Sequence, residues 1–198
     1  QLPKITFEKE KTEETKPEVS PQQIKTPSEA FSQNKAGRRI VKIIELYNYM
    51  DNPTTENGKE ALDELQKLRE TPKETFDEIR KGTFMLSDFY EVKKQFLVQF
   101  ASTLDVDKEE KIEFLKEGIE RSLQGIHDSN NIQATYTPTI IFDTFINVSE
   151  DSVEIEKLAT EMMTKSPVEV QKNILTSYNR INPEKAGDLA RKYSLNAF

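Results

Sequence analysis

A recurring helix-start motif constrains the fold of this chain more than any other feature. Three segments place a hydroxyl residue before Pro and Glu two residues after it: Thr26-Pro27-Ser28-Glu29, Thr71-Pro72-Lys73-Glu74 and Ser166-Pro167-Val168-Glu169. The hydroxyl can accept an unpaired backbone N–H of the first turn, Pro loses no hydrogen bond there, and Glu can reach back to the cap. Related starts are Asp107-Lys108-Glu109-Glu110 and Asn182-Pro183. Five such signals predict a series of consecutive helices.

The segments after these starts carry apolar residues at helical spacing. In 38–50, one face holds Ile40, Ile43, Ile44, Tyr47 and Met50. Such stripes are typical of helices packed on a core, and we predict the same role for rows further along. These rows are Phe89, Tyr90, Phe96, Leu97, Phe100 and Leu104; Ile112, Leu115, Ile119 and Leu123; Leu158, Met162 and Met163; Val170, Ile174, Leu175 and Tyr178; and Ala186, Leu189, Ala190 and Tyr193.

One stretch, 125–148, is ambiguous between helix and strand. Its first part, 125–131 (GIHDSNN), has the composition of a loop. The β-branched run that follows could form a strand, but no other segment offers it a partner, and Thr137-Pro138 resembles a helix start. We therefore predict a helix over 138–147.

The N-terminal residues differ from the rest of the chain. Residues 1–36 contain four of the nine prolines and equal numbers of Lys and Glu. Dense mixed charge with few apolar residues cannot offset the entropy cost of ordering, so we predict a polar arm over 1–25 and a single α-helical domain over 26–198. The apolar residues Leu2, Ile5 and Phe7 are candidates for docking on the domain or on a partner.

Composition excludes several classes of function. The formal charge of −7 argues against a duplex nucleic-acid binder, and we interpret the basic pair Arg38 and Arg39 as a solvated helix start. The absence of Cys removes disulfides, thiolate nucleophiles and Cys-based zinc sites. No apolar run approaches the length of a membrane span. Because the chain begins at Gln1, which indicates a processed or truncated N-terminus, and lacks Cys, we expect an extracytoplasmic protein.

Two segments 78 residues apart are similar. Aligning 91–110 with 169–188 pairs identical residues at Glu91/Glu169, Val92/Val170, Lys94/Lys172 and Leu97/Leu175. Each segment reads as an amphipathic helix, a short polar turn and a second helix. The offset is close to two units of a helical-hairpin repeat, for which about 33–47 residues per unit is typical. The segment midway, 131–149, matches poorly.

On these residues, and on the helical segments 76–80 (FDEIR) and 168–172 (VEVQK), the chain resembles HEAT-type and related α-solenoid repeats. The resemblance covers about two-thirds of the chain and implies antiparallel helical hairpins stacked as a short solenoid. It departs from the family in lacking a regular proline and Asp/Arg ladder across units. The alternative is an irregular helical bundle.

No residue is assigned a catalytic, cofactor or metal role. His127, the only histidine, lies in a predicted loop and reads as an exposed side chain rather than part of a triad with Asp128 and Ser129. The acidic run at 105–109 (DVDKE) resembles a calcium loop but lacks Gly at position six and a bidentate Glu at position twelve, and Asp128-Ser129-Asn130 is also incomplete. The isolated glycines form no phosphate loop.

Carboxylates are the only catalytic groups this composition supplies in quantity. Glu117 and Glu120 stand three apart on one predicted helix, a spacing that a solvated face explains. Asn147-Val148-Ser149 fits a glycosylation sequon. These observations favour a non-enzymatic protein-interaction or scaffold module that binds a protein partner through residues not yet assigned. The alternatives are a carboxylate-only enzyme acting on a glycan and a self-assembling structural component.

Overall fold

The computed structural model describes residues 25–196, and this part of the chain is helical almost throughout. It contains five short 3-10 helices, at 47–49, 83–85, 88–90, 126–128 and 132–135, and no strand beyond one isolated bridge between Lys25 and Leu86. The α-helices of the described part are α1 (Pro27–Ala30), α2 (Lys35–Leu46), α3 (Glu56–Glu70), α4 (Pro72–Gly82), α5 (Glu91–Ser102), α6 (Lys108–Gly125), α7 (Thr137–Ser149), α8 (Ser152–Lys165), α9 (Val168–Asn179) and α10 (Pro183–Lys192). The predicted all-α class is confirmed.

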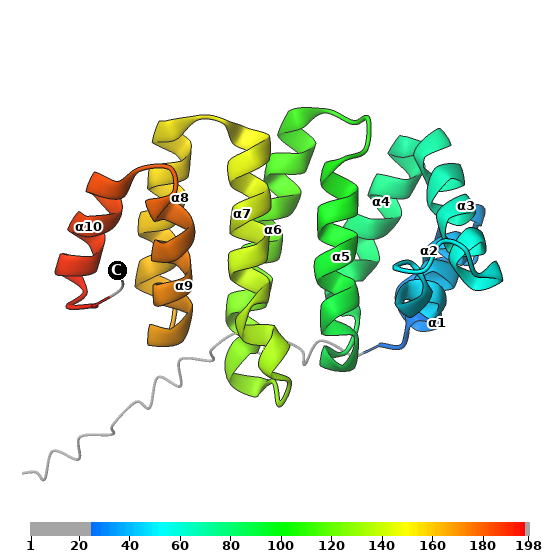
Figure 1. The fold of residues 1–198 in the computed structure, drawn as a ribbon, viewed down its shortest axis with the longest axis horizontal. Helices are drawn as coiled ribbons and strands as arrows, with labels where there is room; N and C mark the ends of the chain where they lie inside the picture. Colours follow the sequence, from blue (N-terminus) through cyan, green and yellow to red (C-terminus); the bar gives the residue numbers. More distant parts are fainter. Residues whose placement is uncertain (1–24, 197–198) are drawn as a thin grey trace, which may run out of the picture.

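The helices form antiparallel hairpins stacked side by side in two layers. In Figure 1, α5, α7 and α9 lie nearest the viewer, and α4, α6 and α8 lie behind them. Within the first layer α7 packs directly on both α5 and α9, and α6 packs along α7. Helices α1, α2 and α3 close one end of the array and α10 closes the other. No helix between residues 25 and 196 combines the length and apolar character needed to cross a bilayer.

The helix starts follow the predicted motifs only in part. The Thr26 backbone N–H donates to Glu29 Oε1 at 3.2 Å, and the Asn182 side chain accepts from the Lys185 N–H, with Pro183 at the first helical position. At Thr71 and Asp107 the helices begin where expected, but neither side chain caps the helix. The hydrogen bond expected there is absent because the motif sets where a helix starts, not the rotamer of its first side chain.

One predicted start is wrong in detail. The Ser166 hydroxyl donates backwards to the Met162 carbonyl at 2.6 Å, so it belongs to the end of α8. Pro167 therefore occupies the cap position, and α9 begins at Val168. Three starts that the motif did not identify are capped by side chains, at Asn34, Thr55 and Asp151.

One continuous apolar core runs through the described helices and contains most of the predicted stripes. Ile40, Ile43 and Ile44 are buried, whereas Tyr47 and Met50 are only partly covered. Phe89 was wrongly placed in the core, since its side chain is 78% exposed. It precedes α5, in a 3-10 turn whose side-chain directions do not continue the periodicity of the helix.

The ambiguous stretch is helical, as predicted. Helix α7 extends from Thr137 to Ser149, one residue before and two beyond the predicted range. The apolar run is explained by the contacts of α7. It packs against α5, α6, α8 and α9 and is therefore covered on several sides. Ile141, Phe142 and Phe145 are all fully buried. A helix surrounded by other helices can be apolar around most of its circumference, and such a sequence is easily mistaken for a buried strand.

The described chain begins at Lys25, the last residue of the predicted arm. Its backbone N–H donates to the Met85 carbonyl at 2.9 Å, and the Ser87 N–H donates to the Lys25 carbonyl at 3.1 Å. Lys25 is therefore already part of the fold. Residues 1–24 of the predicted arm, with Leu2, Ile5 and Phe7, lie outside the described residues.

The buried carboxylate of Glu78 on α4 fixes the turn before α2. It accepts the Ser32 backbone N–H at 3.1 Å and the Asn34 side-chain amide at 3.0 Å. Burial of Glu78 acts to raise its pKa, but the hydrogen bonds from Ser32 and Asn34 and the charge of Lys81 outweigh burial, and the pKa is lowered. Residues 32–34 consequently belong to the folded unit.

The two similar segments occupy equivalent places in the array. Helices α5 and α9 both belong to the first layer, with α7 between them, and each is followed by a helix of the hairpin. Leu97 and Leu175 are both buried, but Glu91 is buried where Glu169 is exposed. The α7–α8 hairpin lies between them in the chain, although its sequence does not match theirs.

Candidate interaction site

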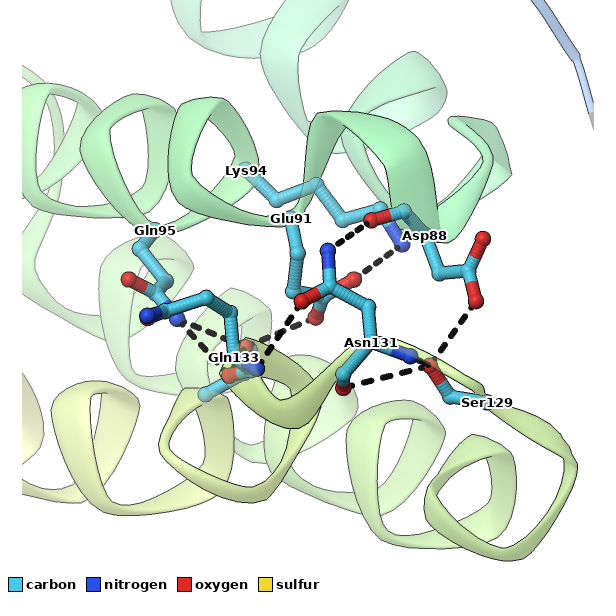
Figure 2. Close-up of polar contacts among 8 residues, drawn as sticks. Asp88, Glu91, Lys94, Gln95, Ser129, Asn131 and Gln133 are labelled. Atoms are coloured by element: carbon cyan, nitrogen blue, oxygen red, sulfur yellow. Dashed lines mark hydrogen bonds and ion pairs between the residues drawn. The ribbon is translucent and has the colours of Figure 1, made fainter.

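A buried polar cluster joins the start of α5 to the start of α7 (Figure 2). The carboxylate of Glu91 accepts a hydrogen bond from the Thr137 hydroxyl at 2.7 Å and forms an ion pair with Lys94 at 3.0 Å. The Gln95 side-chain amide donates to Thr137 Oγ1 and to the Gln133 carbonyl, each at 3.1 Å. Glu91, Gln95 and Thr137 are all buried, and each of them has a hydrogen-bond partner inside the protein.

The same cluster continues to the surface and fixes the loop before α7. The Ser129 hydroxyl donates to Asp88 Oδ2 at 2.9 Å, and the Asn131 side-chain amide donates to the Asp88 carbonyl at 2.7 Å. Asn131 Oδ1 in turn accepts the Gln133 backbone N–H at 3.0 Å. A loop that would otherwise be held only at its ends is thus bonded to the turn before α5, as Figure 2 shows.

These two bonded segments expose a group of large apolar side chains. They form what we call the apolar patch: Phe89 (78% exposed), Val92 (39%), Ile132 (70%) and Tyr136 (44%). Each member lies beside a residue of the cluster, since Phe89 follows Asp88, Val92 follows Glu91, Ile132 follows Asn131 and Tyr136 precedes Thr137. The Phe89 ring also packs edge-on against Tyr90 at 5.1 Å between centroids. The patch is therefore carried by a backbone that hydrogen bonds hold in place.

The exposed apolar residue Val153 stands apart from the patch. Val153, at the start of α8, is 73% exposed, but the neighbouring residues Asp151, Ser152 and Glu154 are polar. It lies at the opposite end of the layers from the patch, because the α7–α8 connection and the loop at 126–136 are at opposite edges of Figure 1. Single exposed apolar residues are normal on a protein surface, whereas a group of them on one face marks an interaction site.

A second hollow lies between α6 and α8 and has a volume of about 270 Å³. Its floor is apolar, with Ile119, Leu123, Leu158 and Met162, and its rim is charged. Lys116 on α6 and Glu154 on α8 form an ion pair across it at 3.0 Å. The hollow exists because α6 and α8 do not pack closely on each other.

The carboxylates Glu117 and Glu120 line this hollow, as do Glu154 and Glu161. Glu117 forms an ion pair with Arg80 at 2.7 Å. Hydrogen bonds from Ser149 and Lys116 lower the pKa of Glu154. A general acid in glycoside hydrolysis needs a carboxyl with a raised pKa. The hydrogen bonds to Glu154 shift its pKa in the opposite direction, so Glu154 is not suited to that role.

The remaining candidate residues are not brought together. His127 is exposed in a 3-10 turn, and Ser129 and Asn131 nearby are engaged with Asp88. Within residues 25–196, no group of three His, Asp or Glu side chains is placed to hold a metal ion. Asp107 occupies the N-cap position of α6, but its side chain makes no capping hydrogen bond.

The sequon and the basic pair are parts of packed helices. Asn147 is exposed on α7, but Ser149 is buried and donates to Glu154 Oε2 at 2.8 Å. A helical sequon with a buried serine is a poor glycosylation acceptor, because these sites normally lie in accessible loops. Arg38 is exposed, whereas Arg39 is partly buried and pairs with Glu64 at 2.9 Å. The solvated interpretation therefore holds for only one arginine of the pair.

Sequence reasoning assigned no residue to the site, although a signal was present. Glu91 and Gln95 stand at i and i+4 on the α5 face that continues with Val98, which is fully buried. Polar residues in line with a core position indicate a buried network. The predicted core row included Phe89 and left out Glu91 and Gln95. For this reason neither the buried network nor the exposure of the Phe89 ring was predicted.

No protein-family model matches the chain, and no significant match was found among curated proteins or among solved structures. The resemblance to HEAT-type repeats therefore stays a prediction, and function has to be argued from the geometry of the described residues.

Proposed function

We propose that this protein is a non-enzymatic interaction or scaffold module and that the apolar patch is its contact surface for a protein partner. The observation that carries the proposal is the patch itself: four exposed apolar side chains on two segments that a buried polar cluster fixes to each other. Exposed apolar groups of this kind favour protein contacts, since binding removes them from water.

The fixed backbone strengthens this interpretation. Ordering a loop on binding costs free energy, and a surface that is already ordered avoids that cost. Ser129, Asn131 and Gln133 use their hydrogen bonds to hold the loop against α5 rather than leaving it to be ordered by a partner. Aromatic residues such as Phe89 and Tyr136 are also the type that contributes strongly at protein interfaces.

The test is affinity capture from the native source with three baits: wild type, the double variant Phe89→Ser/Ile132→Ser, and the control Val153→Ser. We expect a discrete partner with wild type and the control, and at least a tenfold reduction with the double variant, since central interface residues contribute about 2 kcal/mol or more. All three baits should unfold at nearly the same temperature, because every substituted side chain is exposed.

Two results would count against the proposal. Capture that is equal for all three baits would place the contact elsewhere on the molecule. A mass that rises with concentration, and falls to the monomer in the double variant, would make a second copy of this chain the occupant of the patch. That result would favour the self-assembling alternative over a separate partner.

A further inference from the structure

The described chain enters the fold next to the apolar patch. The two hydrogen bonds that fix Lys25 are made to Met85 and Ser87, and Ser87 precedes Phe89 by only two residues. Leu86, which pairs with Lys25, is buried in the core, so this point of entry is firmly held. Whatever precedes Lys25 is therefore tethered beside Phe89, and not beside the hollow between α6 and α8 or near Val153.

The preceding segment contains a group of apolar residues that suits such a surface. Between residues 1 and 24 the aliphatic and aromatic residues are Leu2, Ile5, Phe7, Val19 and Ile24, and three of the five fall within the first seven positions. The 17 residues between Phe7 and Lys25 allow a span of up to about 60 Å when extended, which is ample to return to a surface that adjoins Lys25.

We propose that residues 2–7 of the same chain bind the apolar patch and that a protein partner must displace them. The competition with a partner rests on the proposed function. The contact between residues 2–7 and the patch rests only on the position of Lys25 and on the apolar residues of that segment. Phe7 would pack against Phe89, and Leu2 and Ile5 would cover Ile132 and its neighbours. The segment then acts as an intramolecular competitor that sets the affinity for the partner.

The tether makes a weak contact sufficient. A short linker holds its end at an effective concentration of about 1 mM, so a segment that binds in this range occupies the patch for a large fraction of the time. If the patch is covered for about two-thirds of the time, the apparent affinity for a partner falls about threefold. Replacing Leu2, Ile5 and Phe7 should therefore raise the apparent affinity for the partner about threefold.

The absence of Cys allows a direct test in the full chain. A nitroxide attached at Lys4→Cys, between Leu2 and Ile5, broadens the NMR signals of amides that lie near it. We expect strong broadening at Phe89, Ile132 and Tyr136 and none at Val153. The broadening should persist on dilution and should be lost when Leu2, Ile5 and Phe7 are changed together to Ser. Val19→Ser, a change at another apolar residue of the same segment, serves as the matched control and should leave it unchanged.

Two outcomes of the labelling experiment would overturn the inference. One is the absence of selective broadening at the patch. The other is broadening that also appears in unlabelled chains mixed with labelled ones, since the contact would then be between copies. A truncation of residues 1–36 cannot replace the triple substitution. It would also remove the buried Phe31 and the partners of Glu78 at Ser32 and Asn34.

Partner capture then tests the competition. The triple variant Leu2→Ser/Ile5→Ser/Phe7→Ser should capture about threefold more partner than wild type, and equal capture would overturn the competitive role. Failure of the proposed function looks different, because no bait would then depend on Phe89 and Ile132. The label would still report whether the segment covers the patch in the free protein.

Discussion

The two layers of helices are held together in different ways. In the α5–α7–α9 layer, neighbouring helices pack directly on one another, and the cluster of Glu91, Gln95 and Thr137 joins two of them inside the protein. In the other layer, Phe76 on α4 and Phe114 on α6 make a buried edge-on ring contact at 5.6 Å between centroids, and the further links are ion pairs at the surface. They connect α4 to α6 through Arg80 and Glu117, α6 to α8 through Lys116 and Glu154, and α8 to α10 through Glu156 and Lys185.

The two layers therefore differ in the share of exposed ion pairs among the contacts between their helices. Buried contacts exclude water, so they are strong and insensitive to salt, whereas exposed ion pairs contribute little and are screened. The apolar patch belongs to the tightly packed layer, where its backbone is fixed. The hollow between α6 and α8 belongs to the other layer, where the helices are further apart.

The largest effect is expected from Phe142→Ala in α7. Phe142 is fully buried in the central helix of the tight layer. Truncation removes apolar contacts and leaves a cavity, which should lower the free energy of unfolding by about 3–5 kcal/mol. Urea unfolding followed by circular dichroism measures this change. Val153→Ala is the control, since Val153 is exposed on α8, and it should stay within about 0.5 kcal/mol of wild type. A similarly small loss for Phe142→Ala would mean that the tight layer is not the centre of stability.

A smaller loss should follow from Glu91→Ala in the buried cluster. The change leaves the Lys94 ammonium and the Thr137 hydroxyl without their shared acceptor, and hydrogen bonds to charged groups contribute about 2 kcal/mol. Thr137→Val should cost about 1 kcal/mol, because it removes one hydroxyl from the same cluster. The double variant should cost less than the sum of the two, since both changes remove one shared hydrogen bond. Strict additivity in urea unfolding would show that the two side chains are not coupled.

A loss of about 1 kcal/mol at neutral pH is expected for Glu78→Gln, which exchanges charge-assisted hydrogen bonds for neutral ones. The pKa of Glu78 is lowered in the folded protein, so the stabilisation is complete above the unfolded value of about 4.3 and is lost as pH falls through the folded value. Urea midpoints measured from neutral pH to about pH 3 should therefore converge for wild type and variant. If the urea midpoints of wild type and Glu78→Gln instead differed by the same amount at every pH, the lowered pKa of Glu78 would be contradicted.

The fold class could be predicted because its determinants are local. Helix starts at Thr26, Thr71 and Asn182 depend on a few adjacent residues, and the stripe at Ile40, Ile43 and Ile44 depends on helical spacing alone. The side-chain partner of Ser166 could not be predicted, because its hydroxyl can either accept a backbone N–H of the following helix or donate to a carbonyl of the preceding one, and in the structure it donates to Met162.

The candidate site could not be predicted because it depends on contacts between distant residues. Thr137 reads as a helix cap, yet its hydroxyl donates to a carboxylate 46 residues earlier. Glu91 and Glu169 are identical in the aligned segments, but only Glu91 has such a partner and is buried. Burial of a polar residue depends on what the opposite helix offers, and the local pattern does not contain that information.

The smallest expected effect gives the sharpest comparison of the two layers. Arg80 links α4 to α6 through Glu117 at 2.7 Å and Glu113 at 3.4 Å, with all three side chains partly exposed. Arg80→Gln should therefore cost only about 0.5 kcal/mol at low ionic strength. At about 1 M salt, where the screening length is about 3 Å, that cost should approach zero. The cost of Thr137→Val should be the same at both salt concentrations, because its partners are buried. If Arg80→Gln instead lost the same stability at both, the guanidinium would act by packing its apolar stem, and the two layers would be held together by the same kind of contact.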